Sequence, residues 1–171
     1  MHFKIFKYYF INSFDTNNLK KQDKETIIIY RNYSSKNIDI TKLIKLKNFL
    51  RKKGNKLFIA NNFKLALKLG LDGAYIPSFN KEFYHLSYST AVNFEIIGSA
   101  HNLKEIRNKE LQKVQKIFIS SLFKRNKNYL GLNKFKILKK FTKKEVIALG
   151  GISSRNIKKI YLAKISSIAG I

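Results

Sequence analysis

The sequence of 171 residues predicts an α/β fold, namely a compact (β/α)8 barrel of the TIM type that lacks the last helix. Short apolar runs alternate with helical patterns along the whole chain, which indicates strands joined by helices. The apolar runs are continuous, as is typical of parallel strands that are covered on both sides. No linker, repeat or low-complexity segment interrupts this alternation, so residues 1–171 are predicted to form a single barrel domain.

The first half of the chain carries four of the eight predicted strands, at 7–11, 26–31, 56–60 and 73–76. A helix is predicted over 40–53, because leucines and a phenylalanine recur on one face and Gly54 follows the last turn. Asn61 or Asn62 is expected to cap the next helix. Residues 12–24, between the first two strands, are interpreted as a polar stretch.

The second half of the chain carries the other four predicted strands, at 94–98, 116–120, 145–149 and 165–169. Asn102, followed three residues later by Glu105, forms a capping box that predicts the start of a helix after the fifth strand. Further helices are expected over about 133–141 and after the seventh strand, where apolar residues recur from Ile157 to Tyr161.

The length of the chain leaves a second fold open. Eight units in 171 residues average about 21 residues each, whereas barrels of this kind typically have roughly 250 residues in total. A smaller doubly wound sheet is therefore the alternative. In the barrel, the missing eighth helix would expose apolar surface beside the first and last strands, and we expect a homodimer contact or the N-terminal segment to cover it.

The net charge of +25 has two interpretations. Nucleic-acid binding is the obvious one, but only five of the 35 basic residues are arginines, the residue type suited to bidentate contacts with phosphates and bases. Lysine, asparagine and isoleucine are all abundant, as expected from an A/T-rich genome, and the lysines are spread along the whole chain. We therefore do not expect nucleic acid as a partner, and we expect an attraction for phosphorylated small molecules.

The composition also bears on the compartment. The sequence has no cysteine, which excludes disulfides and thiolate metal sites and fits a cytoplasmic location. No apolar run approaches the roughly 18 residues that span a membrane, so no membrane partner is expected. Residues 1–11 lack a cleavage site of small residues and are interpreted as containing the first strand, not as a signal peptide.

A glycine turn is the most informative motif. Gly150 and Gly151 directly follow the predicted strand 145–149, and a helical pattern follows them. A strand, a glycine turn and a helix N-terminus together place backbone N–H groups where they can bind a phosphate. The next strand ends at Gly170, and in a (β/α)8 barrel the loops after the seventh and eighth strands commonly share one phosphate.

Five segments suggest a family. They are Ala60-Asn61-Asn62, Leu71 to Ile76, Ile97-Gly98-Ser99-Ala100-His101, Ala148 to Ile152 with Asn156, and Ala169-Gly170-Ile171. Together they resemble, in the same order and spacing, segments of the thiamine-phosphate synthase and TenI-like family. This resemblance covers nearly the whole chain and implies a (β/α) barrel.

The resemblance also implies a reaction. In that family a thiazole phosphate displaces diphosphate from a hydroxymethylpyrimidine diphosphate, and Mg²⁺ assists the departure of the diphosphate. The resemblance implies that Ser99 and Lys127 are catalytic, the match of Lys127 requiring a shift of about one position. The expected ligands of the pyrimidine diphosphate are Arg31, Asn61 and His101, and those of the thiazole phosphate are Gly150, Gly151, Ala169 and Gly170.

The sequence departs from the family pattern at several positions. The magnesium-binding aspartates of the family correspond to Asn62 and Asn80, and neutral amides bind Mg²⁺ weakly. Ile29 and Tyr33 stand where the family has glutamine and lysine around the arginine. The alternative function is therefore a catalytically impaired, TenI-like protein that binds a phosphorylated ligand or regulates.

The histidine after the fifth strand allows a third interpretation. His101 could serve as the general acid or base of a tautomerase, but a role in capping the helix is favoured. The tautomerase branch of the family carries a histidine after the sixth strand, where this chain has Ser121, and this weakens the tautomerase interpretation.

Overall fold

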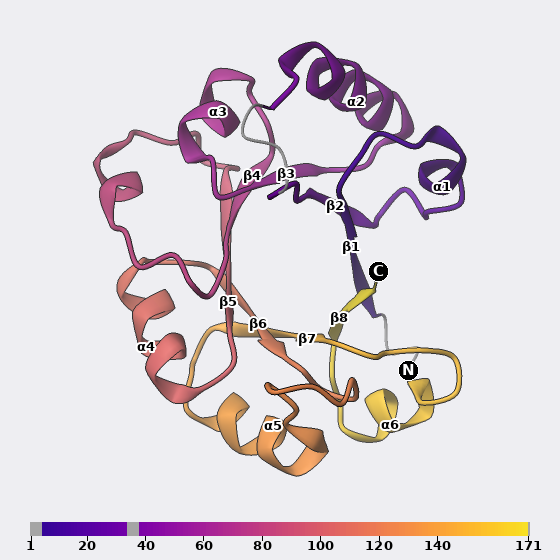
Figure 1. Cartoon of the computed structure of the whole chain (residues 1–171), viewed down its shortest axis with the longest axis vertical. Coiled ribbons are helices and arrows are strands. Elements are labelled where there is room, and N and C mark those ends of the chain that lie inside the picture. Colours follow the sequence, from indigo (N-terminus) through magenta and orange to yellow (C-terminus); the bar gives the residue numbers. More distant parts are fainter. Residues whose placement is uncertain (1–4, 34–37, 171) are drawn as a thin grey trace.

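The strands form a closed parallel barrel in the computed structural model, which describes residues 5–33 and 38–170. Each strand pairs with its neighbours in sequence, and the last strand pairs with the first (Figure 1). The strands are β1 Phe6–Ile11, β2 Ile27–Tyr30, β3 Leu57–Ala60, β4 Gly73–Ile76, β5 Glu95–Ala100, β6 Lys116–Ser120, β7 Glu145–Leu149 and β8 Ser167–Gly170. The predicted barrel is confirmed, and the doubly wound alternative is wrong because the sheet has no open edge.

The strand bounds differ from the predicted ones at a few ends. β4, β6 and β7 have the predicted bounds, and β5 is two residues longer at its carboxyl end. β8 begins at Ser167 and not at Ile165, because the amide of Ile165 still donates to the carbonyl of Ile160 in the preceding helix. The apolar run therefore includes the end of a helical connection.

The helices surround the barrel (Figure 1). They are α1 Thr16–Lys20, α2 Ile40–Lys53, α3 Phe63–Lys68, α4 Leu103–Leu111, α5 Gly131–Lys140 and α6 Ile157–Leu162, with the 3-10 helix η1 Tyr84–Ser87 between β4 and β5. The sequence prediction missed α1, a five-residue helix that begins because Asp15 accepts hydrogen bonds from the amides of Asn17 and Asn18. None of the helices in these described ranges is long and apolar enough to cross a membrane.

The apolar core has two layers because successive residues of a strand point to opposite faces. The larger layer lies between the strands and the helices. The smaller layer fills the lumen with Tyr8, Phe10, Ile29, Phe58, Ala60, Tyr75, Ile97, Phe118, Ile147 and Ala169. The aromatic rings in the lumen meet largely edge to face, with centroids 5.3 Å apart for Tyr8 and Phe118. The barrel interior is therefore packed.

A polar cluster closes the amino end of the barrel. The ammonium group of Lys116 lies 2.9 Å from Glu95 and 3.5 Å from Glu145, and it donates a hydrogen bond to the Tyr8 hydroxyl. Ser167 donates to the second carboxylate of the cluster, Glu145. Burial alone would lower the pKa of Lys116, but the bonds to Glu95 and Tyr8 outweigh it and raise that pKa.

One sector of the barrel lacks a helix among the described residues. Figure 1 shows β8 and β1 side by side between α6 and α1 with no helix outside them. Phe6 on β1 is 48% exposed and Leu162 at the end of α6 is 83% exposed. The apolar surface expected beside these strands is present, and a homodimer contact over it stays a prediction.

Candidate functional site

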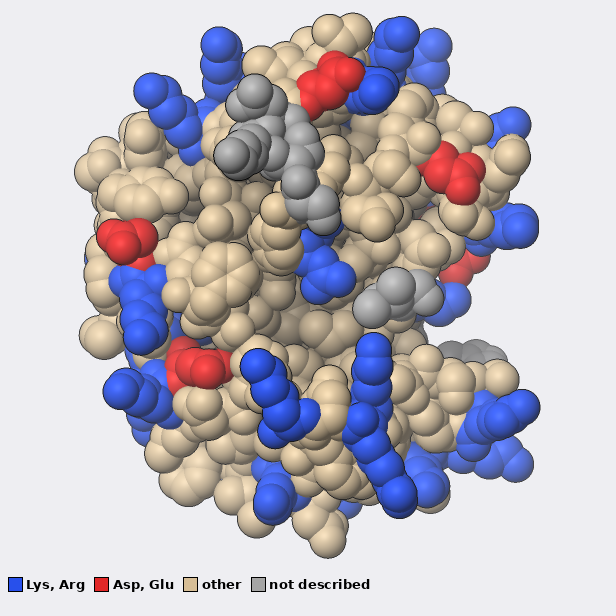
Figure 2. Space-filling model, in the orientation of Figure 1, with Lys and Arg blue, Asp and Glu red and all other residues tan. Residues whose placement is uncertain are grey.

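Basic and neutral polar side chains gather where the strands end. Figure 2 shows this face hollowed near its centre, with Lys and Arg side chains in and around the hollow and few acidic ones. Arg31 follows β2, and its guanidinium lies 4.6 Å from the centre of the Phe10 ring in the lumen. With the end of β1, Arg31 lines a cavity of about 220 Å³. Arg31 forms no ion pair with a carboxylate among the described residues, and Asp15 is the acidic residue that lines the same cavity.

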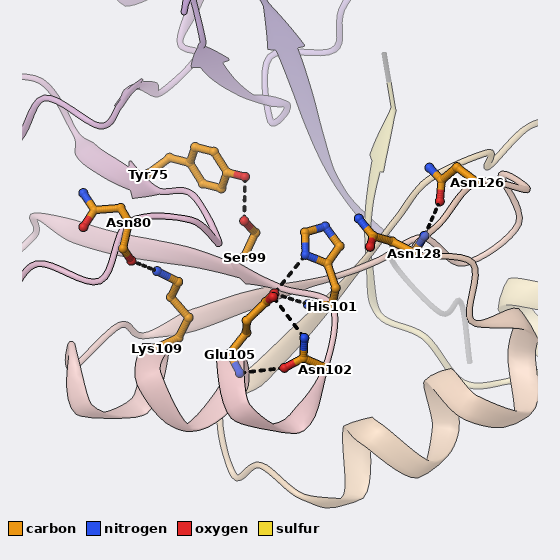
Figure 3. A network of polar contacts seen from close by, with 9 residues as sticks. All are labelled: Tyr75, Asn80, Ser99, His101, Asn102, Glu105, Lys109, Asn126 and Asn128. Carbon is orange, nitrogen blue, oxygen red and sulfur yellow. Dashed lines mark hydrogen bonds and ion pairs between the residues drawn. The ribbon is translucent and has the colours of Figure 1, made fainter.

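Ser99 lies in the lumen near the carboxyl end of the barrel. It projects from β5, is 4% exposed, and its Oγ accepts a 2.8 Å hydrogen bond from the hydroxyl of Tyr75 on β4 (Figure 3). Burial raises the pKa of Tyr75, so this hydroxyl stays protonated and remains a donor. Ser99 was predicted as a catalytic residue, whereas Tyr75 was not predicted as part of the site, although the alternation of residues along β4 places this tyrosine in the lumen.

Three asparagines lie at the ends of β3 and β4. Asn80 donates from its side-chain amide to Oδ1 of Asn61, and this contact joins the two loops. Oδ1 of Asn80 also accepts a 2.8 Å bond from the amide of Glu82. Asn62 caps α3, because its Oδ1 accepts a bond from the amide of Leu65. The helix cap is therefore Asn62 and not Asn61.

His101 directly follows β5, and its contacts are those of a helix start. Glu105 accepts hydrogen bonds from the backbone amide of His101 at 2.8 Å and from its Nδ1 at 2.9 Å, while Asn102 caps α4 by accepting from the amide of Glu105 (Figure 3). This geometry confirms that Asn102 caps the predicted helix, while the carboxylate of Glu105 accepts from the backbone amide of His101 and not from that of Asn102. It also supports the favoured capping role of His101 over a role as a free general base.

The glycine turn after β7 packs against the loop after β6. Gly150 and Gly151 have φ angles of +105° and +72°, a region that favours glycine. A Cβ on Gly150 would lie 2.4 Å from Oγ of Ser121, and one on Gly151 would lie 2.5 Å from the amide of Lys124. The carbonyl of Gly150 accepts bonds from the amides of Phe123 and Lys124. Close approach of two loops therefore explains both glycines.

The turn lies beside the end of β8. Leu149 is in register with Ala169, and Gly170 is in register with Tyr9 on β1. The four residues predicted to bind phosphate therefore come from adjacent strand ends. The helix after the turn begins only at Ile157, and Asn156 bridges this gap by donating to the carbonyl of Gly151 and accepting from the amide of Ser153. The helix predicted from the apolar residues between Ile157 and Tyr161 is confirmed, and residues 152–156 separate its first turn from the two glycines.

Lys127 belongs to the loop between β6 and α5 and is exposed. Two bonds shape this loop, because the amide of Ser121 donates to the carbonyl of Asn128 and the amide of Leu130 donates to the carbonyl of Ser121. Asn126 accepts a further bond from the amide of Asn128 (Figure 3). The structure gives Lys127 no contact with the other predicted site residues in the described part of the chain.

Comparison with known families decides the affiliation of the chain. Residues 18–171 match the family model described as thiamine monophosphate synthase, and this match covers most of the sequence. The chain belongs to the thiamine monophosphate synthase family.

The chain is similar to one known protein in sequence and to two solved structures in fold. A thiamine-phosphate synthase of Methanococcus vannielii is 33% identical over 79 residues, which make up 43% of this chain and 38% of that protein, so the match spans less than two-fifths of the length of that relative. A thiamine phosphate pyrophosphorylase from Pyrococcus furiosus superposes with a TM-score of 0.79 at 20% identity, over 99% of this chain and 86% of the other. The corresponding protein from Bacteroides thetaiotaomicron gives a TM-score of 0.64 at 16% identity, over 97% and 82% of the two chains. At these identities the two structures show the shared fold alone.

The Mg²⁺ implied for this family does not fit the residues at the two expected positions. The side-chain oxygens of Asn62 and Asn80 each accept a hydrogen bond from a backbone amide, and neither residue carries a charge. The described residues contain no group of three or more His, Cys, Asp or Glu side chains that could hold a metal ion. Mg²⁺ prefers carboxylate oxygens and phosphate oxygens, so these two asparagines are poor ligands for it.

An aromatic pair at the rim of the site was not predicted from the sequence. The rings of Tyr33, after β2, and Phe79, after β4, meet edge to face with centroids 5.6 Å apart, and both are more than half exposed. Partial burial of Tyr33 raises its pKa above the usual value. Spacing alone could not reveal this pair, because the two residues come from different loops.

Proposed function

We propose that the chain is a thiamine-phosphate synthase-type transferase, which joins hydroxymethylpyrimidine diphosphate to a thiazole phosphate and releases diphosphate. The observation that carries the proposal is the guanidinium of Arg31, which lies over the Phe10 ring at the mouth of the barrel without a carboxylate partner among the described residues. Membership in the thiamine monophosphate synthase family supplies the substrate class. An arginine placed in this way suits bidentate binding of a diphosphate.

The proposed step breaks one bond and forms another. The bond between the pyrimidine methylene and the diphosphate oxygen breaks with both electrons leaving on the diphosphate, and a thiazole nitrogen forms the new bond to the methylene carbon. Positive charge develops on the methylene carbon, and negative charge develops on the leaving group. Arg31 stabilises the leaving group, and the aromatic mouth of the lumen shelters the reacting carbon from water.

The remaining predicted residues take supporting roles in this proposal. Ser99 is held by Tyr75 beneath the mouth and contacts the pyrimidine diphosphate, to which Asn61 and His101 also bind from the ends of β3 and β5. The backbone of Gly150, Gly151, Ala169 and Gly170 binds the thiazole phosphate at the adjacent ends of β7 and β8. Lys127, on the exposed loop after β6, adds positive charge when the diphosphate binds.

The alternative is a protein that binds a phosphorylated ligand but no longer performs the transfer. The observation that favours it is the engagement of Asn62 and Asn80 by backbone amides at the positions where the family binds Mg²⁺. Asn62→Asp separates the two functions, because aspartate also caps a helix and adds one carboxylate. Turnover that depends on Mg²⁺ and rises in this variant would identify an impaired enzyme.

The first experiment is an assay of thiamine phosphate formation from the two substrates, with and without Mg²⁺. We expect turnover that Arg31→Ala abolishes and that Arg107→Ala leaves intact, because Arg107 pairs with Glu110 on the outer surface of α4. If there is no turnover but the thiazole phosphate still raises the melting temperature, the binding-protein alternative replaces the proposal. If neither signal is observed, both functions are wrong.

The compartment and the assembly belong to the same proposal. We place the chain in the cytoplasm, where its phosphorylated substrates occur and where a sequence without cysteine is at no disadvantage. We also propose a homodimer that covers the helix-free sector beside β8 and β1. A monodisperse monomer in light scattering would contradict the dimer.

A further inference from the structure

Helix α4 buries an ammonium group away from the lumen. Lys109 and Gln112 are both 0% exposed. The ammonium of Lys109 donates to the backbone carbonyl of Asn80 at 2.8 Å (Figure 3). It also donates to Oε1 of Gln112 at 2.7 Å. A buried ammonium is costly unless it is hydrogen-bonded, so a fold that keeps one needs its bonds.

The ammonium and the neighbouring amide hold the segment between β4 and β5. This segment, residues 77–94, has the short helix η1 as its regular structure. Gln112 donates from Nε2 to the carbonyls of Asn80 and Glu82, at 3.2 and 2.8 Å. In return, Nε2 of His85 donates to the carbonyl of Gln112 at 2.9 Å. The backbone carbonyls of Asn80, Glu82 and Gln112 therefore accept the hydrogen bonds that fasten this segment to the end of α4.

Strand β5 leaves room for the lysine. A Cβ added to Gly98 would lie 2.7 Å from Cδ of Lys109 and 3.1 Å from its Cγ. The aliphatic part of the lysine therefore runs directly over this glycine before its ammonium reaches the loop. Packing and hydrogen bonding both define the position of this side chain.

The fastened segment carries two residues of the mouth. The side chain of Asn80, whose carbonyl accepts from Lys109, donates to Asn61 at the end of β3. Phe79, one residue earlier, packs its ring against Tyr33. A shift of the segment would move both contacts. The ammonium of Lys109 therefore affects the mouth of the barrel through its hydrogen bond to the backbone carbonyl of Asn80.

We propose that Lys109 is a positioning residue for the substrate site, holding the β4–β5 segment so that Asn80 and Phe79 meet Asn61 and Tyr33 at the mouth. This inference rests on the proposed function for its effect on turnover, whereas its effect on the geometry of the mouth is independent of turnover.

The charged groups around Lys109 are few. Glu105, on the same helix as Lys109, accepts hydrogen bonds from His101 and Asn102. The backbone carbonyl of Glu82 accepts a hydrogen bond from the side chain of Gln112. His85 faces the pair from η1. Burial lowers the pKa of Lys109 to about 8, a shift that the charge of Glu105 partly opposes, so the amine is largely protonated at neutral pH.

The test compares two lysines that each donate to a backbone carbonyl. Lys109→Met keeps the aliphatic chain over Gly98 and removes the ammonium. Lys47→Met is the matched control, because Lys47 donates to the carbonyl of Leu69 at 2.6 Å, outside the set of contacts that reach the mouth. The readouts are the side-chain amide NMR resonances of Asn61 and Asn80, the melting temperature, and kcat and KM for the transfer.

We expect Lys109→Met to shift the Asn61 and Asn80 amide resonances and to lower kcat/KM at least tenfold, with Lys47→Met within twofold of the wild type. Unchanged resonances in folded Lys109→Met would overturn the proposal. If the wild type shows no turnover, the proposed function fails and the resonances alone decide the role of Lys109. If Lys109→Met does not fold, a pH titration of the wild type decides, followed by the backbone carbonyl ¹³C resonance of Asn80, which accepts the bond from Lys109. Loss of the proton of Lys109 weakens this bond and must shift that resonance, and a resonance that stays unchanged throughout the pH range in which the protein is folded would overturn the proposal.

Discussion

The two ends of the barrel treat charge in opposite ways. At the amino end, Lys116 lies between Glu95 and Glu145 and bonds Tyr8, so its charge is balanced within the protein. At the carboxyl end, the cation Arg31 lies against the Phe10 ring. An internal ion pair contributes to stability, whereas a cation without a carboxylate partner attracts an anionic ligand. The comparison indicates that stability and binding are assigned to opposite ends of the lumen.

Two lumen tyrosines show the same difference. Tyr8 points its hydroxyl to the lysine at the amino end, and burial raises its pKa to about 12 even though Lys116 opposes the shift. Tyr75 points its hydroxyl to Ser99 at the carboxyl end. One phenol completes an ion cluster, and the other orients a neutral side chain beneath the mouth. Edge-to-face contacts of both rings with Phe118 connect the two ends through a packed interior.

Removal of the cation at the mouth should separate binding from stability most strongly. We expect Arg31→Ala to lower kcat/KM at least 100-fold, which corresponds to about 2.7 kcal/mol of transition-state stabilisation, because the leaving diphosphate loses its cation. The free energy of unfolding should change by less than about 1 kcal/mol, since Arg31 has no ion pair to lose within residues 5–33 and 38–170. Steady-state kinetics and urea unfolding measure the two quantities. A loss of stability that matches the loss of activity would contradict the division between the ends.

Removal of the cation at the closed end should have the reverse effect. Lys116→Met leaves Glu95 and Glu145 facing each other without a cation, and we expect the free energy of unfolding to fall by about 2–3 kcal/mol. Because the lysine is partly exposed, this value lies below that of a fully buried pair. KM should stay within twofold of the wild type wherever the variant is folded. A large increase in KM with normal stability would show that this end also takes part in binding.

Much of this division could be predicted from the sequence, but not all of it. Continuous apolar runs and the order of the segments predicted the barrel, and Arg31, Asn61 and His101 directly follow strands as the sequence indicated. The ion cluster was not predicted, since Lys116 begins one strand and its partners Glu95 and Glu145 begin two others. Closure of the barrel brings these three side chains together, and the spacing of the three residues along the chain does not indicate that they are close in space.

The connections of the barrel were the hardest to predict. The five-residue helix α1 depends on the cap at Asp15 and has too few apolar positions for a periodic pattern. In the sequence, Lys109 does not differ from the many lysines expected on exposed helix faces. Its burial follows from the packing of α4 on Gly98. The roles of the glycines after β7 were only partly predicted, because their contact partners lie in the loop after β6.

The glycine turn tests whether the mouth also needs internal packing. Gly150→Ala places a methyl group against Ser121 in a backbone conformation that favours glycine, and we expect a loss of about 2 kcal/mol in the free energy of unfolding. Gly170→Ala is the control for stability, because its Cβ would meet no atom within 4 Å, and its effect should stay below about 0.5 kcal/mol. Equal effects of both substitutions in urea unfolding would contradict the packing explanation.

The smallest expected effect concerns the pH dependence of stability and separates Lys109 from both ends of the barrel. In the folded protein burial lowers the pKa of Lys109 to about 8, while the unfolded chain keeps the ordinary value of 10.5. Between these values the unfolded state binds more protons than the folded state, so this lysine makes stability rise with pH. We expect the free energy of unfolding of the wild type, relative to Lys109→Met, to increase by about 1 kcal/mol from pH 7 to pH 9. Urea unfolding of both proteins at several pH values measures the difference, in which the contributions of the other titrating groups cancel. A difference that stays constant, or that falls with pH, would show that burial does not lower the pKa of Lys109 in the folded protein.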